Sequence, residues 1–214
     1  MKIEDDLPRT RNPTTTTETP RVEADSSSRE AAVDIELLRK SAAGDGKAFH
    51  ALVDRHADRL YRLAVSLIGN AADAEDVLQE ALTGAYRGLS GFQGRASVKT
   101  WLTRILVMQV AKWRRDRKRR RSGATAIDDG EADAQPAASG GATGGAGVVD
   151  ARLDVHAAVQ RLSAEHRQVI ALREFEHLSY DEMAEVLDLP RGTIESRLHR
   201  ARAELKEILK SYLP

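Results

Sequence analysis

Two arginines near the carboxyl end of the chain have the spacing and the chemistry of DNA-reading residues. Arg197 and Arg200 lie three residues apart, so a helix would place both on one face. A guanidinium can direct two donors at the edge of a guanine, or it can neutralise a phosphate. We predict that the outward face of this helix contacts duplex DNA. Its other members are Arg191, Thr193, Glu195, Ser196 and His199.

A basic run is the second feature with a recognisable chemistry. It extends from Lys112 to Arg121, and Asp116 is the single acidic residue in it. A helix end of this kind gives a high local positive potential, which suits the backbone of a nucleic acid. Trp113 lies within the run and could stack on an unpaired base. A solvated helix end, or a basic tail that serves solubility, is the alternative.

A third feature is acidic. Asp76 and Glu80 are four residues apart and face away from the apolar stripe of their helix, and Asp73 and Gln79 belong to the same stretch. An acidic face would repel DNA, so it is better suited to a basic protein surface. The alternative is that the early acidic residues only complement the dipole of the helix.

Composition excludes several classes of function. The sequence has no cysteine, which excludes disulfides, cysteine-based zinc sites and thiol nucleophiles. Its histidines lack metal-ligand spacing, no glycine-rich loop follows a strand, and no Gly-x-Ser-x-Gly occurs. We therefore predict a protein that is not an enzyme and that uses neither a cofactor nor a metal. The absence of an apolar leader and of a long apolar stretch predicts a cytoplasmic protein without membrane insertion.

Helices must position these residues. Hydrophobic residues make up 41% of the chain but aromatic residues only 4%, and charged residues make up 31%, which favours helices with narrow apolar stripes over sheets. Apolar residues recur every three or four positions after Asp45, after Asn70 and after Ser97. The two latter residues can each cap a helix. We predict an all-α fold.

The segment from Leu178 to Leu205 predicts a helix-turn-helix. Ser179 and Glu182 have the spacing of a capping box, and the turn Asp188-Leu189-Pro190 separates a short helix from a longer basic one. An ordinary helical hairpin with solvated charges is the alternative.

The distribution of polar and glycine-rich stretches predicts four segments. Residues 1–33 are polar, and we expect a disordered tail. Residues 34–121 form the first helical domain. Residues 122–150 are rich in Gly, Ala, Ser and Asp, and we expect a flexible linker. Residues 151–214 form the second helical domain.

Taken in this order, the features resemble the extracytoplasmic-function (ECF) sigma factors of bacterial RNA polymerase. Asp73–Ala81 resembles sigma region 2.2, and Phe92–Ile105 resembles the segment that opens the −10 helix. Region 4 is matched by Arg161–Val169, Leu178–Leu187 and Gly192–Arg202. The resemblance implies two small helical domains, region 2 and region 4, joined by a flexible linker. It also implies a factor that binds core polymerase and directs transcription initiation.

The resemblance assigns roles to individual residues. It implies that Asp73, Asp76, Gln79 and Glu80 bind the β′ clamp of the polymerase. It implies −10 DNA binding by Trp101, Arg104, Met108, Gln109, Lys112, Trp113, Arg114 and Arg115. The outward residues from Arg191 to Arg200 would read the −35 element while the domain rests on the β flap. An anti-sigma protein is the implied inhibitor.

One departure and two alternatives stay open. Many relatives carry Asn and Asp where this sequence has Met108 and Lys112, so either the −10 preference differs or Gln109 reads the base. A helix-turn-helix regulator that binds operators as a dimer would share residues 178–205 but would not need the acidic face or the basic helix. A protein that binds polymerase but not DNA is the third possibility.

Overall fold

The computed structural model describes residues 20–124 and 155–210, and within them every regular element is a helix. The all-α prediction is confirmed. The predictions for residues 1–19 and for linker residues 125–150 lie outside the described residues. Residues 122–124, predicted to begin the linker, instead end the helix that starts at Val98. The first group of helices is α1 (Pro20–Ala42), α2 (Gly46–Ile68), α3 (Ala71–Gly88), the 3-10 turn η1 (Leu89–Gly91) and α4 (Val98–Ala124). The second is a helix at 155–161, α6 (Ala164–Ile170), the π-helical turn η2 (Ala171–Phe175), α7 (Tyr180–Leu187) and α8 (Arg191–Lys210).

Local side-chain caps set the starts of the N-terminal helices. The Asp45 carboxylate accepts from the amides of the first turn of α2, and Asn70 accepts from the amide of Asp73 at 3.0 Å. The Ser97 hydroxyl accepts from the amide of Thr100 at 3.0 Å. Each bond satisfies an amide that the helix itself leaves without a partner. The three predicted helix starts are confirmed.

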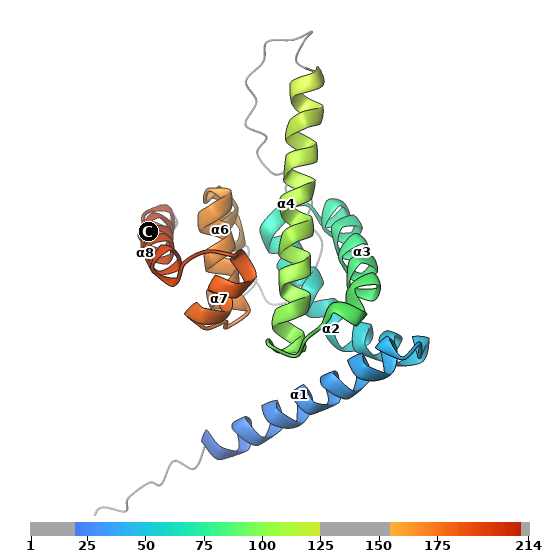
Figure 1. The fold of residues 1–214 in the computed structure, drawn as a ribbon. Helices are drawn as coiled ribbons and strands as arrows, with labels where there is room; N and C mark the ends of the chain where they lie inside the picture. The colour runs from blue at the N-terminus through green and yellow to red at the C-terminus, as the bar shows by residue number, and fades with distance from the viewer. Residues whose placement is uncertain (1–19, 125–154, 211–214) are drawn as a thin grey trace, which may run out of the picture.

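The core of the N-terminal domain lies between α2, α3 and α4 (Figure 1). Its largest buried side chains come from α2 and α4, while α3 contributes small ones: Leu52, Leu60, Leu63 and Leu67, then Leu106 and Val110, then Ala74, Ala81 and Ala85. Small residues on α3 let its backbone approach the other two helices closely. This packing holds α4 fixed along its first half and leaves the second half to project beyond the body (Figure 1).

Residues 20–33 differ from the sequence prediction of a disordered tail, because α1 begins at Pro20. Proline is tolerated in the first turn of a helix, and Glu30, Ala31 and Ala32 are strong helix formers. Leu38, 5% exposed, anchors the later part of α1 in the core. Because adding residues to an anchored helix costs less than starting a new one, α1 extends towards the N-terminus. The polar composition of these residues does not indicate this extension.

The helix-turn-helix is present as predicted. Ser179 and Glu182 form the capping box at the start of α7. Asp188 ends that helix in the left-handed conformation at φ 53°, which turns the chain into α8. The buried face of α8 carries Ile194, Leu198 and Ala201, and it packs on α6 and α7.

The two helical domains are in direct contact. α4 packs against α7, and α2 contacts both α6 and η2. The buried residues of both domains form one continuous hydrophobic cluster.

Candidate nucleic-acid interface

The exposed face of α8 is the first part of the interface. Of the side chains predicted to read duplex DNA, Arg191, Glu195, Ser196, His199 and Arg200 are exposed, and Thr193 and Arg197 are half-buried. Ser196, His199 and Arg200 lie away from the buried stripe of α8, whereas Arg191 and Arg197 flank it. The predicted residues therefore spread around the exposed side of α8 and do not form one narrow row.

Ion pairs already constrain two of the arginines. Arg191 donates to Asp181 at 3.1 Å and to Glu195 at 2.9 Å, and its hydrogen bond to Glu195 raises the pKa of the guanidinium. Arg197 pairs with Glu165 at 3.1 Å. In the part of the chain that the structure describes, no carboxylate pairs with Arg200. The donors of Arg200 are therefore not engaged by an ion pair within the described residues.

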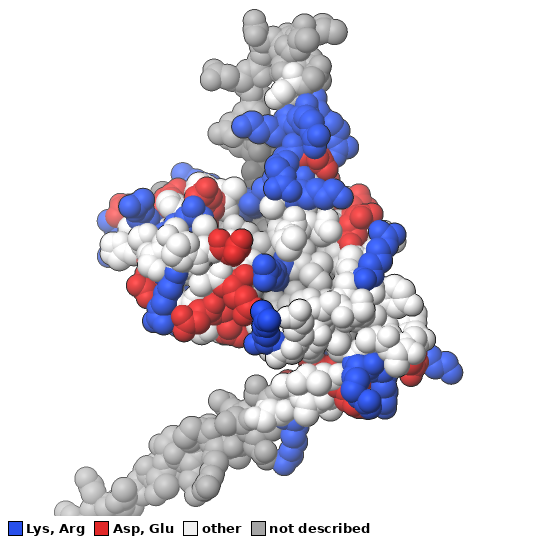
Figure 2. Space-filling model, viewed as in Figure 1, with Lys and Arg blue, Asp and Glu red and all other residues white. Residues whose placement is uncertain are grey.

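The projecting half of α4 is the second part of the interface. Figure 2 shows Lys and Arg side chains gathered around this end of the helix. Lys112, Arg115 and the residues from Lys118 to Arg121 are exposed there. Nearer the body, Met108 is 60% exposed, while Arg104 and Gln109 are half-buried. The helix thus offers a positive surface with one prominent apolar side chain.

Trp113 is only partly free for stacking. The guanidinium of Arg117 lies 5.1 Å from the centre of the Trp113 ring, and the same side chain donates to Asp73 at 3.1 Å. Trp113 is also partly buried and packs against the hydrophobic core, so only part of its ring is exposed. Arg117 was predicted only as part of the basic run; its role in holding Trp113 depends on α3 and could not be seen in the sequence.

Two residues of the predicted −10 set point inward. Arg114 donates to the carbonyl of Leu67 at 2.8 Å, and burial lowers the pKa of its guanidinium. Trp101 packs edge-on against Phe92, with 5.4 Å between ring centres. These contacts hold α4 in place. A sequence signal existed for Arg114, because it is four residues after Val110 and continues the buried stripe of α4.

The acidic face of α3 borders the same region. Asp76, Gln79 and Glu80 are exposed, and Asp73 is half-buried. A groove of about 290 Å³ separates this face from α4. Its other lining residues include Gln109, Lys112 and Trp113. Three of the side chains predicted for polymerase (Asp73, Asp76 and Glu80) and three of those predicted for DNA (Gln109, Lys112 and Trp113) therefore line one groove.

Other chemistry is not represented in the described residues. They contain no cluster of three His, Cys, Asp or Glu side chains that could hold a metal ion. Within the same ranges, no helix is both long and apolar enough to cross a bilayer. The fold and the two exposed basic helices define a two-domain, all-helical protein suited to nucleic-acid binding.

Comparison with known families identifies both domains. The model of sigma-70 region 2 matches residues 52–120, and that of sigma-70 region 4 matches residues 152–205. The RNA polymerase sigma-H factor of Pseudomonas aeruginosa is 33% identical over 184 residues, which cover 84% of this chain and 95% of that protein. The ECF sigma factor SigM of Mycobacterium tuberculosis is 36% identical, covering 82% of this chain and 84% of SigM. The sigma-E factor of Escherichia coli is 36% identical, and the match covers 78% of this chain and 88% of that protein.

Solved structures agree with this family. CnrH, in complex with the cytosolic domain of CnrY, has a TM-score of 0.61 and 25% identity, and the match covers 84% of this chain and 98% of CnrH. The sigma factor RpoE of Bartonella quintana was solved in complex with the anti-sigma factor NepR. It has a TM-score of 0.61 and 29% identity, and the match covers 77% of this chain and 98% of RpoE. The chain belongs to the ECF family of RNA polymerase sigma factors. Membership favours the sigma factor over the dimeric regulator that the sequence left open.

Proposed function

We propose that this chain brings core RNA polymerase to promoters through three surfaces. The acidic face of α3 docks on the β′ clamp, the projecting half of α4 holds the −10 strand, and α8 reads the −35 duplex. The observation that supports this proposal best is that one chain exposes two separate basic helices and one acidic face. A dimeric operator-binding protein would need only α8.

The proposed −10 surface consists of the outward side chains of α4. Lys112 and Arg115 neutralise phosphates, Gln109 and Met108 contact bases, and the part of Trp113 that lines the groove stacks on one. Arg104 lies on the same side, one turn before Met108. Arg114 and Trp101 act by fixing the helix that carries these groups.

The proposed −35 surface consists of the outward side chains of α8. Arg200 and His199 are the candidates for base contacts, while Arg191, Ser196 and Thr193 lie near the N-terminal end of the helix, where phosphates bind well. Glu195 and Arg197 enter the interface already paired with Arg191 and Glu165. Each surface alone would bind weakly and in a salt-dependent manner, and the polymerase would combine them.

The test is charge reversal of the acidic face. Asp76→Lys with Glu80→Lys should abolish binding to core polymerase, because a basic partner surface would then be repelled. Asp54→Lys with Asp58→Lys is the matched control, because these residues are also exposed and four apart, but lie on α2. Binding is measured with purified core enzyme by fluorescence anisotropy. Unchanged binding in the Asp76 and Glu80 variant would exclude this docking face.

We also propose a regulatory partner and a location for this chain on the basis of its family. The similar protein CnrH was solved in complex with the cytosolic domain of CnrY, and RpoE of Bartonella quintana in complex with the anti-sigma factor NepR. By analogy, an anti-sigma protein would control this chain. Sigma factors direct the polymerase and are not catalysts themselves, so we expect a non-enzymatic subunit. We expect it to act in the cytoplasm.

A further inference from the structure

The sulfur chemistry of this chain depends on methionine alone. The sequence has no cysteine and three methionines, Met1, Met108 and Met183. Met1 lies outside the described residues, and the other two have opposite surroundings. Met183 of α7 is 0% exposed, whereas Met108 of α4 is 60% exposed. Because an oxidant must reach the sulfur atom, Met108 is the more reactive of these two thioethers.

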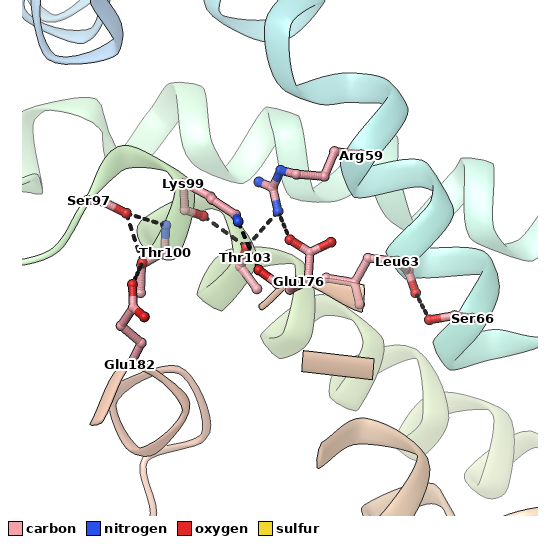
Figure 3. A network of polar contacts seen from close by, with 9 residues as sticks. All are labelled: Arg59, Leu63, Ser66, Ser97, Lys99, Thr100, Thr103, Glu176 and Glu182. Atoms are coloured by element: carbon pink, nitrogen blue, oxygen red, sulfur yellow. Dashed lines mark hydrogen bonds and ion pairs between the residues drawn. The ribbon is translucent and has the colours of Figure 1, made fainter. Parts of the chain in front are cut away.

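Met108 does not help to hold α4 in the fold. Leu106 and Val110, two residues away on either side, are fully buried, while Met108 lies outside the hydrophobic cluster of the described residues. Polar contacts fix the start of the same helix, where the hydroxyl of Thr103 accepts from Arg59 of α2 at 3.1 Å (Figure 3). A chemical change at the Met108 side chain therefore leaves the helix in place.

The neighbours of Met108 on the helix surface are polar. Arg104 lies one turn before it and Lys112 one turn after it, and Gln109 follows it in the chain. Lys112 is exposed, while Arg104 and Gln109 are half-buried. Met108 is thus the apolar member of a row whose other members are cations, and this row belongs to the proposed −10 surface.

Oxidation by hypochlorous acid converts a methionine side chain from apolar to polar. The sulfur loses two electrons and gains one oxygen atom to form a sulfoxide, while the chlorine is reduced to chloride and one proton is released. The sulfoxide oxygen accepts hydrogen bonds, and at Met108 the cations of Arg104 and Lys112 are one turn away. Oxidation therefore removes an apolar surface that can weaken base stacking, and it offers these two cations an acceptor other than DNA.

We propose that Met108 is a reversible oxidation site at which a two-electron oxidant of the hypochlorous acid class switches off promoter opening. The inference rests on the proposed contact between α4 and the −10 strand. Methionine sulfoxide reductases return the sulfoxide to the thioether, so the switch can be reset. The acidic face of α3 lies on a helix without sulfur, so docking on core polymerase persists in the oxidised protein.

The difference in burial makes oxidation of Met108 a switch and not a lesion. A sulfoxide at Met183 would place a polar group inside the core of the helix-turn-helix, where it would destabilise the fold. At Met108 the added oxygen lies at the protein surface, where water can solvate it. The chain oxidised at Met108 therefore stays folded and remains a substrate for reduction.

The first experiment locates the oxidation in the full chain. The folded protein is treated with an equimolar amount of hypochlorous acid, and its peptides are analysed by mass spectrometry. We expect a several-fold excess of sulfoxide at Met108 over Met183, and similar amounts at both positions when the protein is treated in urea. Equal oxidation of the two methionines in the folded protein would overturn the proposal.

The second experiment compares promoter opening before and after treatment, once the oxidant has been removed. Permanganate reactivity of promoter thymines should fall at least about 5-fold for the oxidised wild type, because one base contact is lost. Methionine sulfoxide reductase should restore it, and fluorescence anisotropy should show unchanged binding to core polymerase. Full opening by protein that carries the sulfoxide at Met108 would exclude the switch.

Two variants separate Met108 from the other oxidisable groups, each compared with itself before and after treatment. Met108→Leu retains Met183, and its promoter opening should not change on treatment. Met183→Leu conserves volume in the core, and it should lose opening as the wild type does. A loss in Met108→Leu as large as that of the wild type would assign the effect elsewhere. Opening by untreated wild type tests the proposed −10 contact, so failure of the switch is distinct from failure of the proposed function.

Discussion

At the scale of single residues, the arginines of α8 differ in how much of their binding capacity is already used. Arg197 is engaged by Glu165 and its side chain is 28% exposed, whereas Arg200 is exposed and has no carboxylate partner among the described residues. An arginine held by an internal ion pair loses less conformational freedom on binding but gives up part of its charge. The two residues therefore contribute to −35 binding in different ways.

Arg200→Ala should reduce −35-dependent transcription by about 5- to 150-fold, which corresponds to the loss of a base contact of about 1–3 kcal/mol. Arg197→Ala should have a smaller effect, because part of its interaction energy is internal. Both variants should bind core polymerase as the wild type does. In vitro transcription from a matched pair of promoters, with and without the −35 element, measures this. Full activity of the Arg200 variant would exclude α8 as the reading helix.

Met108 is the most exposed large apolar side chain of α4, at 60%. Apolar side chains of this kind can insert between bases and weaken their stacking. We predict that Met108→Ala slows promoter opening and leaves binding of the closed promoter unchanged, whereas Met108→Asn changes the preferred −10 sequence. Permanganate reactivity of thymines reports opening, and selection from a −10 library reports preference. The same library profile for Met108→Asn and wild type would contradict a base contact.

Sequence periodicity predicts which face of a helix points outward, and it did so for most of this interface. For Arg114 the spacing from Val110 indicates the buried stripe of α4, but it does not indicate the hydrogen-bond partner, which is the Leu67 carbonyl at the end of α2. A carbonyl that becomes available through packing of another helix leaves no mark on the local sequence. For the same reason the partner of Trp113 could not be predicted.

At the scale of elements, α1 is fastened to α2 by a buried cluster of charges. Asp34 accepts from Arg55 at 2.7 Å and is bonded to His56 at 2.8 Å, and the His56 side chain is 10% exposed. Burial lowers the pKa of His56 and outweighs the attraction of the Asp34 carboxylate. The folded protein therefore favours the neutral ring.

The folded-state pKa of His56 is below that of the unfolded chain, so the unfolded chain binds more protons at mildly acidic pH. The free energy of unfolding should therefore decrease as the pH falls through about 6.5, the unfolded value. His56→Gln should make this decrease shallower, and His156, whose pKa is lowered in the same direction, is present in both proteins. Urea unfolding at three pH values between 5.5 and 7.5 measures the difference. Parallel pH profiles would contradict it.

The starts of most helices could be predicted from local sequence signals. Asn70, Ser97 and Ser179 each begin a helix through a bond within the next three residues, and such bonds can be read from spacing. The start of α1 at Pro20 could not be predicted from spacing, because it depends on Leu38 being anchored against another helix. The π-helical turn η2 was also not predicted. Its end at Glu176 is fixed by Arg59, a residue of the other domain.

At the scale of the whole molecule, the segment between the domains determines how far apart they can act. Residues 125–154 lie outside the described structure, but their number is known. About 30 residues can span roughly 100 Å when extended, which exceeds the distance of about 85 Å between the centres of the promoter elements. The length of the chain therefore permits both surfaces to bind one promoter.

Deleting residues 131–148 should leave about 12 residues, which span at most about 40 Å. We predict that this variant still binds core polymerase and promoters that depend on the −10 element alone, but loses activation by the −35 element. Replacing the same residues with a Gly-Ser sequence of equal length is the control and should retain activity. Transcription from the two promoter types measures the effect. Retained −35 dependence after the deletion would show that the elements are not bridged in this way.

The end of α2 gives one position in the chain influence over both domains. Gly69 has φ 82°, which disfavours any residue with a Cβ, and a Cβ placed there would lie 2.5 Å from Oε1 of Gln160. The Gln160 amide donates to the carbonyl of Ser66 at 2.8 Å. An inherited Gly69→Ala change would push this amide away and leave the exposed faces of α4 and α8 as they were. A single methyl group would therefore alter the junction between the two domains and no other surface.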